Sequence, residues 1–233
     1  MQDEFVRVEK YQWGSPLAWH RVSWDGPVFK YVDVEHAAAV SSGSTKIGTI
    51  WGFRQMEGAK RDVGENTIPF RFGLNDELDG RNPRDSALLQ SISLDIDGDV
   101  KIAMRGATVN LVGQDYYACC FAKNSNLPHL QAEKKQAIFQ INDIKAWVRR
   151  ICEIFDVLGP CFVREVSYQD RRALRFEGGV AMPNPFIKPG GFCGEQEVRV
   201  VWLANQSTPM GRYPPLDLVS SDPIIAALLR RVR

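Results

Sequence analysis

Two glutamates and an arginine alternate at the start of an apolar run near residue 200. The segment Phe192–Trp202 reads FCGEQEVRVVW and is rich in β-branched and aromatic residues, which predicts a buried strand. Because side chains alternate along a strand, Glu195, Glu197 and Arg199 would share one face. Burying such charges is unfavourable unless they are paired or used in chemistry, so this strand is predicted to border a cleft.

Two carboxylates held this close can divide acid and base work between them. Like charges at short range raise the pKa of one of the two groups, which suits a proton donor beside an ionised partner. Two structural interpretations stay open on spacing alone. A Glu-x-Glu pair at a strand end is most often solvated surface charge, and Arg199 can form a salt bridge with Glu197 across a neighbouring strand.

The composition is typical of a globular protein with one large domain. The chain has 233 residues, of which 44% are hydrophobic and 24% are charged. The net charge of +1 argues against a general binder of polyanions but allows a local basic patch. No apolar run approaches about 18 residues, and the N-terminus lacks the pattern of a secretory signal. Neither a membrane span nor secretion is therefore expected.

The cysteines and histidines favour a reducing compartment and no metal. Five cysteines without a C-x-x-C pair predict reduced thiols and a cytoplasmic location. His20, His36 and His129 are scattered and lack the spacing of metal ligands, so no metal site is expected.

The remaining pattern predicts many strands and few helices. Residues 1–27, which carry three tryptophans, are expected to form an N-terminal arm packed on a single domain at 28–233. Strands are predicted at 28–32, 46–53, 67–72, 91–96, 100–104, 107–112, 116–121, 162–168 and 173–176, with Asp97-Gly98 as a hairpin turn. Helices are predicted at 34–40 after Asp33, from Asn142 to a stop at Gly159-Pro160, and at 224–232 after Asp222-Pro223. Segregated strands and helices favour an α+β fold.

A series of landmarks then resembles a known group of proteins. In chain order the landmarks are Phe29-Lys30-Tyr31, Ile47–Ile50 followed by Phe53–Glu57, Tyr117–Phe121, Val166–Asp170, and Lys188–Phe192 before Glu195–Arg199. They resemble a group of uncharacterised bacterial and phage-defence proteins that close with a Phe-x-x-Glu-x-Glu-x-Arg strand. That layout is similar to the ADP-ribosyltransferase superfamily. The resemblance covers roughly residues 28 to 203 and implies a mostly antiparallel, split β-sheet core with few helices.

The resemblance also implies a site that cleaves NAD. Glu197 would face the ribose and stabilise the positive charge of an oxocarbenium-like transition state, and Glu195 would deprotonate or orient the acceptor. Lys30 or Arg54 would bind the pyrophosphate of NAD, and Tyr31 or Phe53 would hold the nicotinamide. Thr49 would supply the side-chain hydroxyl that the family carries on its second strand. The chain departs from the family where Lys30 stands in place of an arginine or histidine, for which His20 and Arg21 are rivals, and where no Ser-Thr-Ser signature exists.

The function implied is an NAD-dependent ADP-ribosyltransferase that acts as a toxin or phage-defence effector, with NAD as its substrate. The acceptor would be a macromolecule, sought first among RNA and DNA, and an antitoxin protein would be a further partner. Basic residues that motivate a nucleic-acid acceptor are Arg171, Arg172, Arg175, Lys188, Arg230, Arg231 and Arg233. The alternatives are a non-catalytic binding module on the same fold, with Glu195, Glu197 and Arg199 as structural ion pairs, and an NAD glycohydrolase.

Overall fold

The computed structural model describes most of the chain from His20 onward. The described residues are 20–22, 24–55, 67–72, 77–83, 85–86, 89, 100–104, 106–112, 115–127, 136–169, 174–175, 184–205, 213–218 and 221–233. Several predicted features lie outside them, among them residues 1–19 of the arm, the strand at 91–96 with its Asp97-Gly98 turn, and His129.

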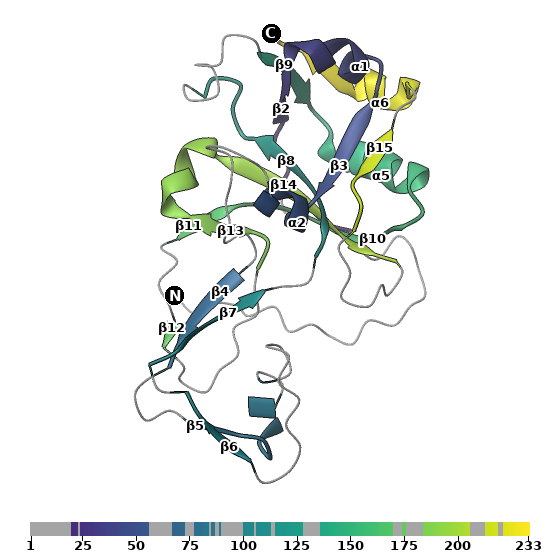
Figure 1. The fold of residues 1–233 in the computed structure, drawn as a ribbon. Coiled ribbons are helices and arrows are strands. Elements are labelled where there is room, and N and C mark those ends of the chain that lie inside the picture. Colours follow the sequence, from purple (N-terminus) through teal and green to yellow (C-terminus); the bar gives the residue numbers. More distant parts are fainter. Residues whose placement is uncertain are drawn as a thin grey trace.

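Within the described residues, a nine-stranded sheet forms the core, in the order β1-β10-β14-β8-β2-β9-β16, with β3 paired to β8 and β15 paired to β3 (Figure 1). Its strands are β1 (His20–Val22), β2 (Val28–Asp33), β3 (Thr45–Thr49), β8 (Tyr117–Ala122), β9 (Gln136–Ile141), β10 (Leu158–Glu165), β14 (Glu197–Ala204), β15 (Leu216–Leu218) and β16 (Leu229–Arg231). Its neighbours run antiparallel except β1 and β10. The α+β class with a mostly antiparallel sheet is therefore confirmed. β1 also gives the predicted arm a strand in this sheet.

The sheet divides along one edge of β8. β2 pairs with β8 through Phe29 and Ala122, whereas β3 pairs with it through Gly48 and Thr49, opposite Ala118 and Tyr117. Between these two contacts, β8 has no partner strand on that edge among the described residues. β2 continues instead along β9, a strand that the sequence pattern did not predict.

Three smaller sheets flank the large one. β11 (Ser167–Gln169) and β13 (Ile187–Pro189) form a parallel pair. β4 (Thr67–Arg71) lies between β7 (Thr108–Val112) and β12 (Leu174–Arg175), and β5 (Glu77–Asp79) pairs with β6 (Lys101–Ala103). Figure 1 shows the β4–β7–β12 and β5–β6 sheets together on one side of the large sheet.

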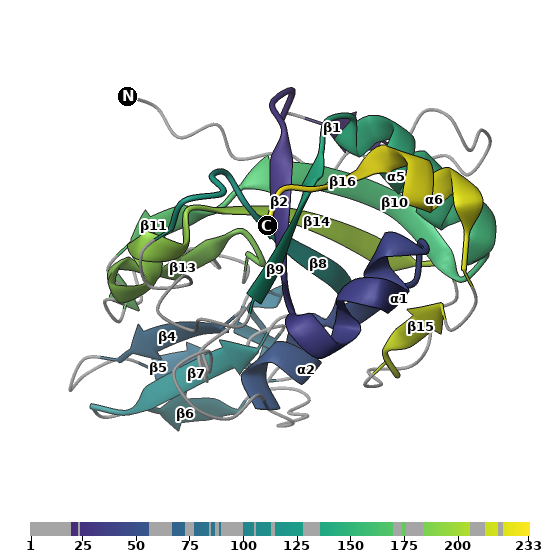
Figure 2. The ribbon, with the colours of Figure 1, turned by 90° about the horizontal axis from the view of Figure 1, so that it is seen from above.

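Helix α5 (Ile144–Ile154) covers one face of the large sheet and forms the main core (Figure 2). The Asp143 carboxylate accepts a hydrogen bond from the Ala146 N–H, so the helix begins where predicted. Its apolar stripe packs on Trp202, with Trp147 and Ile151 fully buried. The predicted stop at Gly159-Pro160 is wrong, because the helix ends at Ile154 and both residues belong to β10.

Two shorter α-helices, α1 (Ala37–Ser41) and α6 (Pro223–Leu228), lie near the chain's C-terminal strand, and the 3₁₀ helix η1 (Val34–His36) directly precedes α1. η1 and α1 follow Asp33 as predicted, although the Asp33 side chain makes no capping hydrogen bond. α6 begins as predicted, because the Asp222 carboxylate accepts from the N–H groups of Ile224 and Ile225. It ends earlier than predicted, and the chain continues as β16 beside β9. None of the described helices is long and apolar enough to cross a lipid bilayer.

The strand predicted at 46–53 is interrupted halfway. β3 ends at Thr49, and helix α2 (Ile50–Gln55) follows directly. The Thr49 hydroxyl accepts a hydrogen bond from the Gly52 N–H at 2.9 Å, and Asp115 accepts from the Trp51 N–H at 2.8 Å. These two side chains satisfy the first free N–H groups of the helix, which is why a β-rich segment turns helical here.

Gly43 lies in the turn between α1 and β3, and substituting it tests the fold. Its φ is +92°, and a Cβ there would lie 2.0 Å from the carbonyl oxygen of Asp222. We expect Gly43→Ala to lower the free energy of unfolding by about 2 kcal/mol or more, because it combines backbone strain with a clash. Urea unfolding measures this. Gly191→Ala is the control, since a Cβ at that position would have no atom within 4 Å, and an equal loss in both variants would contradict the assignment.

Candidate active site

Glu197 opens β14 as a buried carboxylate between two cations. Its side chain is 4% exposed. The Arg199 Nε donates to Glu197 Oε1 at 2.6 Å, and the Lys188 Nζ lies 2.7 Å from Glu197 Oε2. Arg199 itself is completely buried and also donates to the Pro185 carbonyl. We name Lys188, Glu195, Glu197 and Arg199 the Glu197 cluster.

The charges of the cluster keep Glu197 ionised. Burial acts to raise the pKa of Glu197, but the positive charges of Arg199 and Lys188 outweigh it and lower the pKa to about 2. Burial likewise acts to lower the pKa of Lys188, yet the charge of Glu197 outweighs it and the pKa is raised. The cluster is therefore a fixed array of opposite charges at neutral pH.

Glu195 does not lie on the strand, which corrects the prediction. The residues before β14 form a 3₁₀ helix, η3 (Gly190–Glu195), and Gln196 then adopts a left-handed conformation with φ of 45°. This turn breaks the alternation assumed for Phe192–Trp202. The Glu195 carboxylate nevertheless meets the cluster, because its Oε2 lies 2.7 Å from the Lys188 Nζ. The Glu195 side chain is 27% exposed, far more than that of Glu197.

The β11–β13 pair brings Tyr168, together with Lys188, to Glu197. Tyr168 on β11 is in register with Lys188 on β13. The Tyr168 hydroxyl accepts a hydrogen bond from the Glu197 N–H at 2.8 Å, and burial raises the pKa of Tyr168 to about 12. Because Pro185 also contacts Arg199, the chain just before β13 covers this end of β14.

Cys120 contributes a neutral thiol to the same face. It lies opposite Arg199 in the β8–β14 register, and its thiol helps to lower the pKa of the nearby Glu197 carboxyl. Burial and the nearby charge of Glu197 raise the pKa of Cys120 well above its ordinary value. The thiol therefore stays protonated at neutral pH and is a poor nucleophile.

Lys30 lies on the other face of the sheet from Glu197. Phe29 is in register with Ala122, which in turn is in register with Glu197, so the next residue on β2 points to the α5 face. The Lys30 Nζ donates to the Cys120 carbonyl at 3.1 Å, where β8 lacks a partner strand, and is 5.3 Å from the centre of the Phe121 ring. These contacts hold the Lys30 side chain at the division of the sheet.

Tyr31 is linked to the turn beside the cluster. Its hydroxyl donates to the Asn124 carbonyl at 3.0 Å, and the Asn124 side chain donates to Gln196 Oε1 at 2.5 Å. Of the residues expected to bind NAD, Tyr31 is thus tied to the segment between Glu195 and Glu197.

Thr49, Phe53 and Arg54 gather at α2, and Phe53 lies on the same face of the sheet as Glu197. The Thr49 side chain is buried and caps the helix, and Phe53 packs near Val201. Val201 is four residues along β14 from Glu197, a distance of about 13 Å. The Arg54 guanidinium lies 4.8 Å from the centre of the Trp51 ring. α2 therefore lies on the same face of the sheet as the Glu197 cluster, farther along β14.

The basic residues expected to track a nucleic acid do not form one surface where the structure describes their side chains. Lys188 is buried in the Glu197 cluster, so it cannot serve as a surface phosphate contact. Arg230, Arg231 and Arg233 are exposed beside β9 at the sheet edge. Arg171 and Arg172 lie outside the described residues, and the Arg175 side chain is not described.

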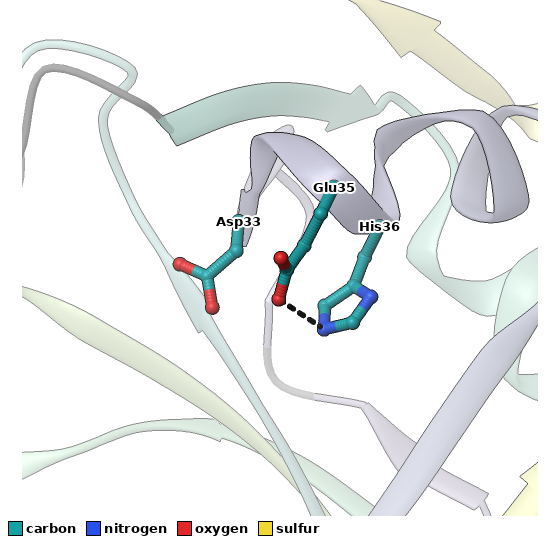
Figure 3. A group of neighbouring side chains, drawn as sticks. All are labelled: Asp33, Glu35 and His36. Carbon is teal, nitrogen blue, oxygen red and sulfur yellow. Dashed lines mark ion pairs between the residues drawn. The ribbon is translucent and has the colours of Figure 1, made fainter.

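Asp33, Glu35 and His36 form a group with metal-ligand atoms within 4.8 Å of one another (Figure 3). All three side chains are exposed, and His36 Nε2 lies 3.6 Å from Glu35 Oε1. The spacing of the histidines alone does not reveal this group. Exposed acidic groups of this kind are common without an ion, and we assign no metal to them.

Lys188, Tyr168 and Cys120 are members of the site that were not predicted. All three stood among the landmarks, but each reaches Glu197 through a pairing between distant segments that local spacing does not reveal. Comparison with known proteins adds no relative: no protein-family model, curated protein or solved structure matches the chain.

Proposed function

We propose that this protein is an NAD-dependent ADP-ribosyltransferase whose reaction takes place at the Glu197 cluster. One observation carries the proposal. Two glutamates singled out by sequence meet at a single lysine, one of them buried and held ionised, the other partly exposed. Such a pair offers a fixed negative charge together with a carboxylate that a second substrate can reach.

The chemistry requires a carboxylate where positive charge develops. Cleavage of the bond between nicotinamide and ribose builds positive charge at the anomeric carbon, which an ionised Glu197 would stabilise. Arg199 and Lys188 each contact one oxygen of Glu197, which fixes the orientation of this ionised carboxylate.

The acceptor and the biological role follow from the same proposal. Glu195 would orient or deprotonate the acceptor, and the protein would act as a toxin or phage-defence effector in the cytoplasm. RNA and DNA are the acceptors to try first, with exposed Arg230, Arg231 and Arg233 as their phosphate contacts, and an antitoxin protein would restrain the activity.

Labelled NAD separates the candidate activities. The purified protein is incubated with NAD labelled in the adenylate half, with and without total cell extract. Release of nicotinamide together with label in a macromolecule supports the transferase, and nuclease and protease digestion then identify the acceptor. Release without transfer of label identifies an NAD glycohydrolase. Absence of release and of NAD binding contradicts both.

A non-catalytic binding module is the second candidate, because Glu197 is so thoroughly paired. Its two carboxylate oxygens contact two buried cations, an arrangement that also fits a purely structural ion pair. In that case, variants of the cluster would lose stability and the wild type would leave NAD intact.

Arg54 is the better placed of the two cations expected at the pyrophosphate, since Lys30 faces the opposite side of the sheet. We expect Arg54→Ala to weaken NAD binding while turnover at saturating NAD stays near that of the wild type. A phosphate contact made equally in the ground and transition states changes affinity alone. Titration calorimetry measures the affinity, with Lys46→Ala, an exposed lysine on β3, as the control. Wild-type affinity in Arg54→Ala would remove it from the site.

A further inference from the structure

Lys188 occupies the centre of the Glu197 cluster. It belongs to β13, and its side chain is only 9% exposed. Its Nζ lies 2.7 Å from Glu195 Oε2 and 2.7 Å from Glu197 Oε2, and 5.5 Å from the centre of the Phe192 ring. One ammonium group thus joins a carboxylate from η3 to a carboxylate from β14.

The two carboxylates depend on this lysine unequally. Because both oxygens contact the same nitrogen, they are no farther apart than twice 2.7 Å, a distance at which like charges disfavour double ionisation. Glu197 has Arg199 as a second cation. Among the described residues, the Glu195 carboxylate has its ion pair with Lys188 alone. Removing Lys188 would therefore release Glu195 and leave two carboxylates facing each other.

We propose that Lys188 is the positioning residue of this site, which holds the Glu195 carboxylate beside Glu197. The proposal rests on the proposed function where it concerns NAD chemistry. Lys188 contacts neither the ribose nor the acceptor in this scheme, and its effect passes through the two glutamates. The charged or titratable side chains that face it are Glu195 from η3, Glu197 and Arg199 from β14, Cys120 from β8 and Tyr168 from β11.

The consequence is a defined dependence on pH. With Lys188 in place, its positive charge lies between the two carboxylates and offsets their repulsion. Without its charge, one proton is shared between the two carboxylates at a higher pH than in the wild type. As the pH is lowered, a variant without this charge then loses activity at a higher pH than the wild type does, if the reaction needs both carboxylates ionised. If the role of Lys188 were purely structural, its removal would lower stability without moving the acid limb of the pH profile.

The test compares Lys188→Met with Lys188→Arg, which keeps the charge. Lys123→Met is the control, because Lys123 pairs with an exposed glutamate, Glu165, at the surface. In Lys188→Met we expect the acid limb of nicotinamide release to move up by about one pH unit or more. We also expect kcat to fall about tenfold or more with little change in KM, and Lys188→Arg to restore most of both.

A second readout does not need activity. Carboxyl ¹³C NMR of glutamate-labelled protein follows the ionisation of Glu195 and Glu197 directly. In Lys188→Met, or in Lys188→Gln should the methionine variant not fold, we expect one of the two carboxyls to titrate at a higher pH than in the wild type. Unchanged titration and an unchanged pH profile would overturn the proposal, whatever the stability. If the wild type releases no nicotinamide, the proposed function fails, while the NMR titration still decides what Lys188 does.

Discussion

Glu197→Gln is expected to lower the free energy of unfolding by about 3 kcal/mol or more and to abolish nicotinamide release. The substitution keeps the shape of the side chain but removes the charge that Lys188 and Arg199 share. Breaking a buried pair in this way leaves uncompensated charge in the interior, which typically costs about 3–5 kcal/mol. The chain should still fold, because a domain of this size is commonly stable by more than that amount.

Unfolding curves measured against pH test the same charge. Since the folded-state pKa of Glu197 lies below its ordinary value of 4.5, its stabilisation is fully present above about pH 4.5 and is lost as the pH falls through about 2. The wild type should lose stability in this window, and Glu197→Gln should lose less. Glu165→Gln, a variant of an exposed pair, is the control and should change stability by about 1 kcal/mol at most. A Glu197→Gln variant as stable and as active as the wild type would remove Glu197 from both roles.

Arg199→Met is expected to destabilise the protein by a similar amount, about 3–5 kcal/mol. The arginine is completely buried, and its loss leaves Glu197 with Lys188 as the remaining cation of the cluster. The double variant Glu197→Gln/Arg199→Met should be more stable than the sum of the single losses predicts, by about 1–3 kcal/mol, because the two groups interact directly.

Urea unfolding of the four proteins in this cycle measures that coupling. Arg164→Met is the matched control, because Arg164 lies opposite Arg199 in the β10–β14 register but is only partly buried. Additive losses would mean that the contact between Arg199 and Glu197 contributes little. Strong coupling with full NAD cleavage in the double variant would favour a structural ion pair over a catalytic one.

The strands and helices that local patterns specify were largely predictable. The stripe that includes Trp147, Val148 and Ile151 predicted helix α5, because its apolar residues recur at helical spacing. Asp222 before Pro223 predicted the start of α6, because the Asp222 side chain caps the helix locally. Strand β9 was missed, although Ala137, Ile138, Phe139 and Ile141 are buried, because its apolar run is short and does not alternate with polar residues.

The candidate site was only half predictable. Glu197 and Arg199 share a face as the alternation predicts, but Glu195 left the strand because Gln196 takes a left-handed conformation. Local sequence also could not show that Lys188 reaches Glu197, since this depends on the parallel pairing of β11 with β13. Thr49 illustrates the opposite case, in which a hydroxyl expected at a ligand serves as a helix cap.

An NMR time course of glutamate-labelled protein mixed with NAD tests the central claim most directly, because one experiment reports the place and the reaction. We predict that the carboxyl signals of Glu195 and Glu197 shift saturably with NAD while that of the exposed Glu165 does not, and that free nicotinamide accumulates. Millimolar NAD that moves neither carboxyl signal and stays intact would contradict the account.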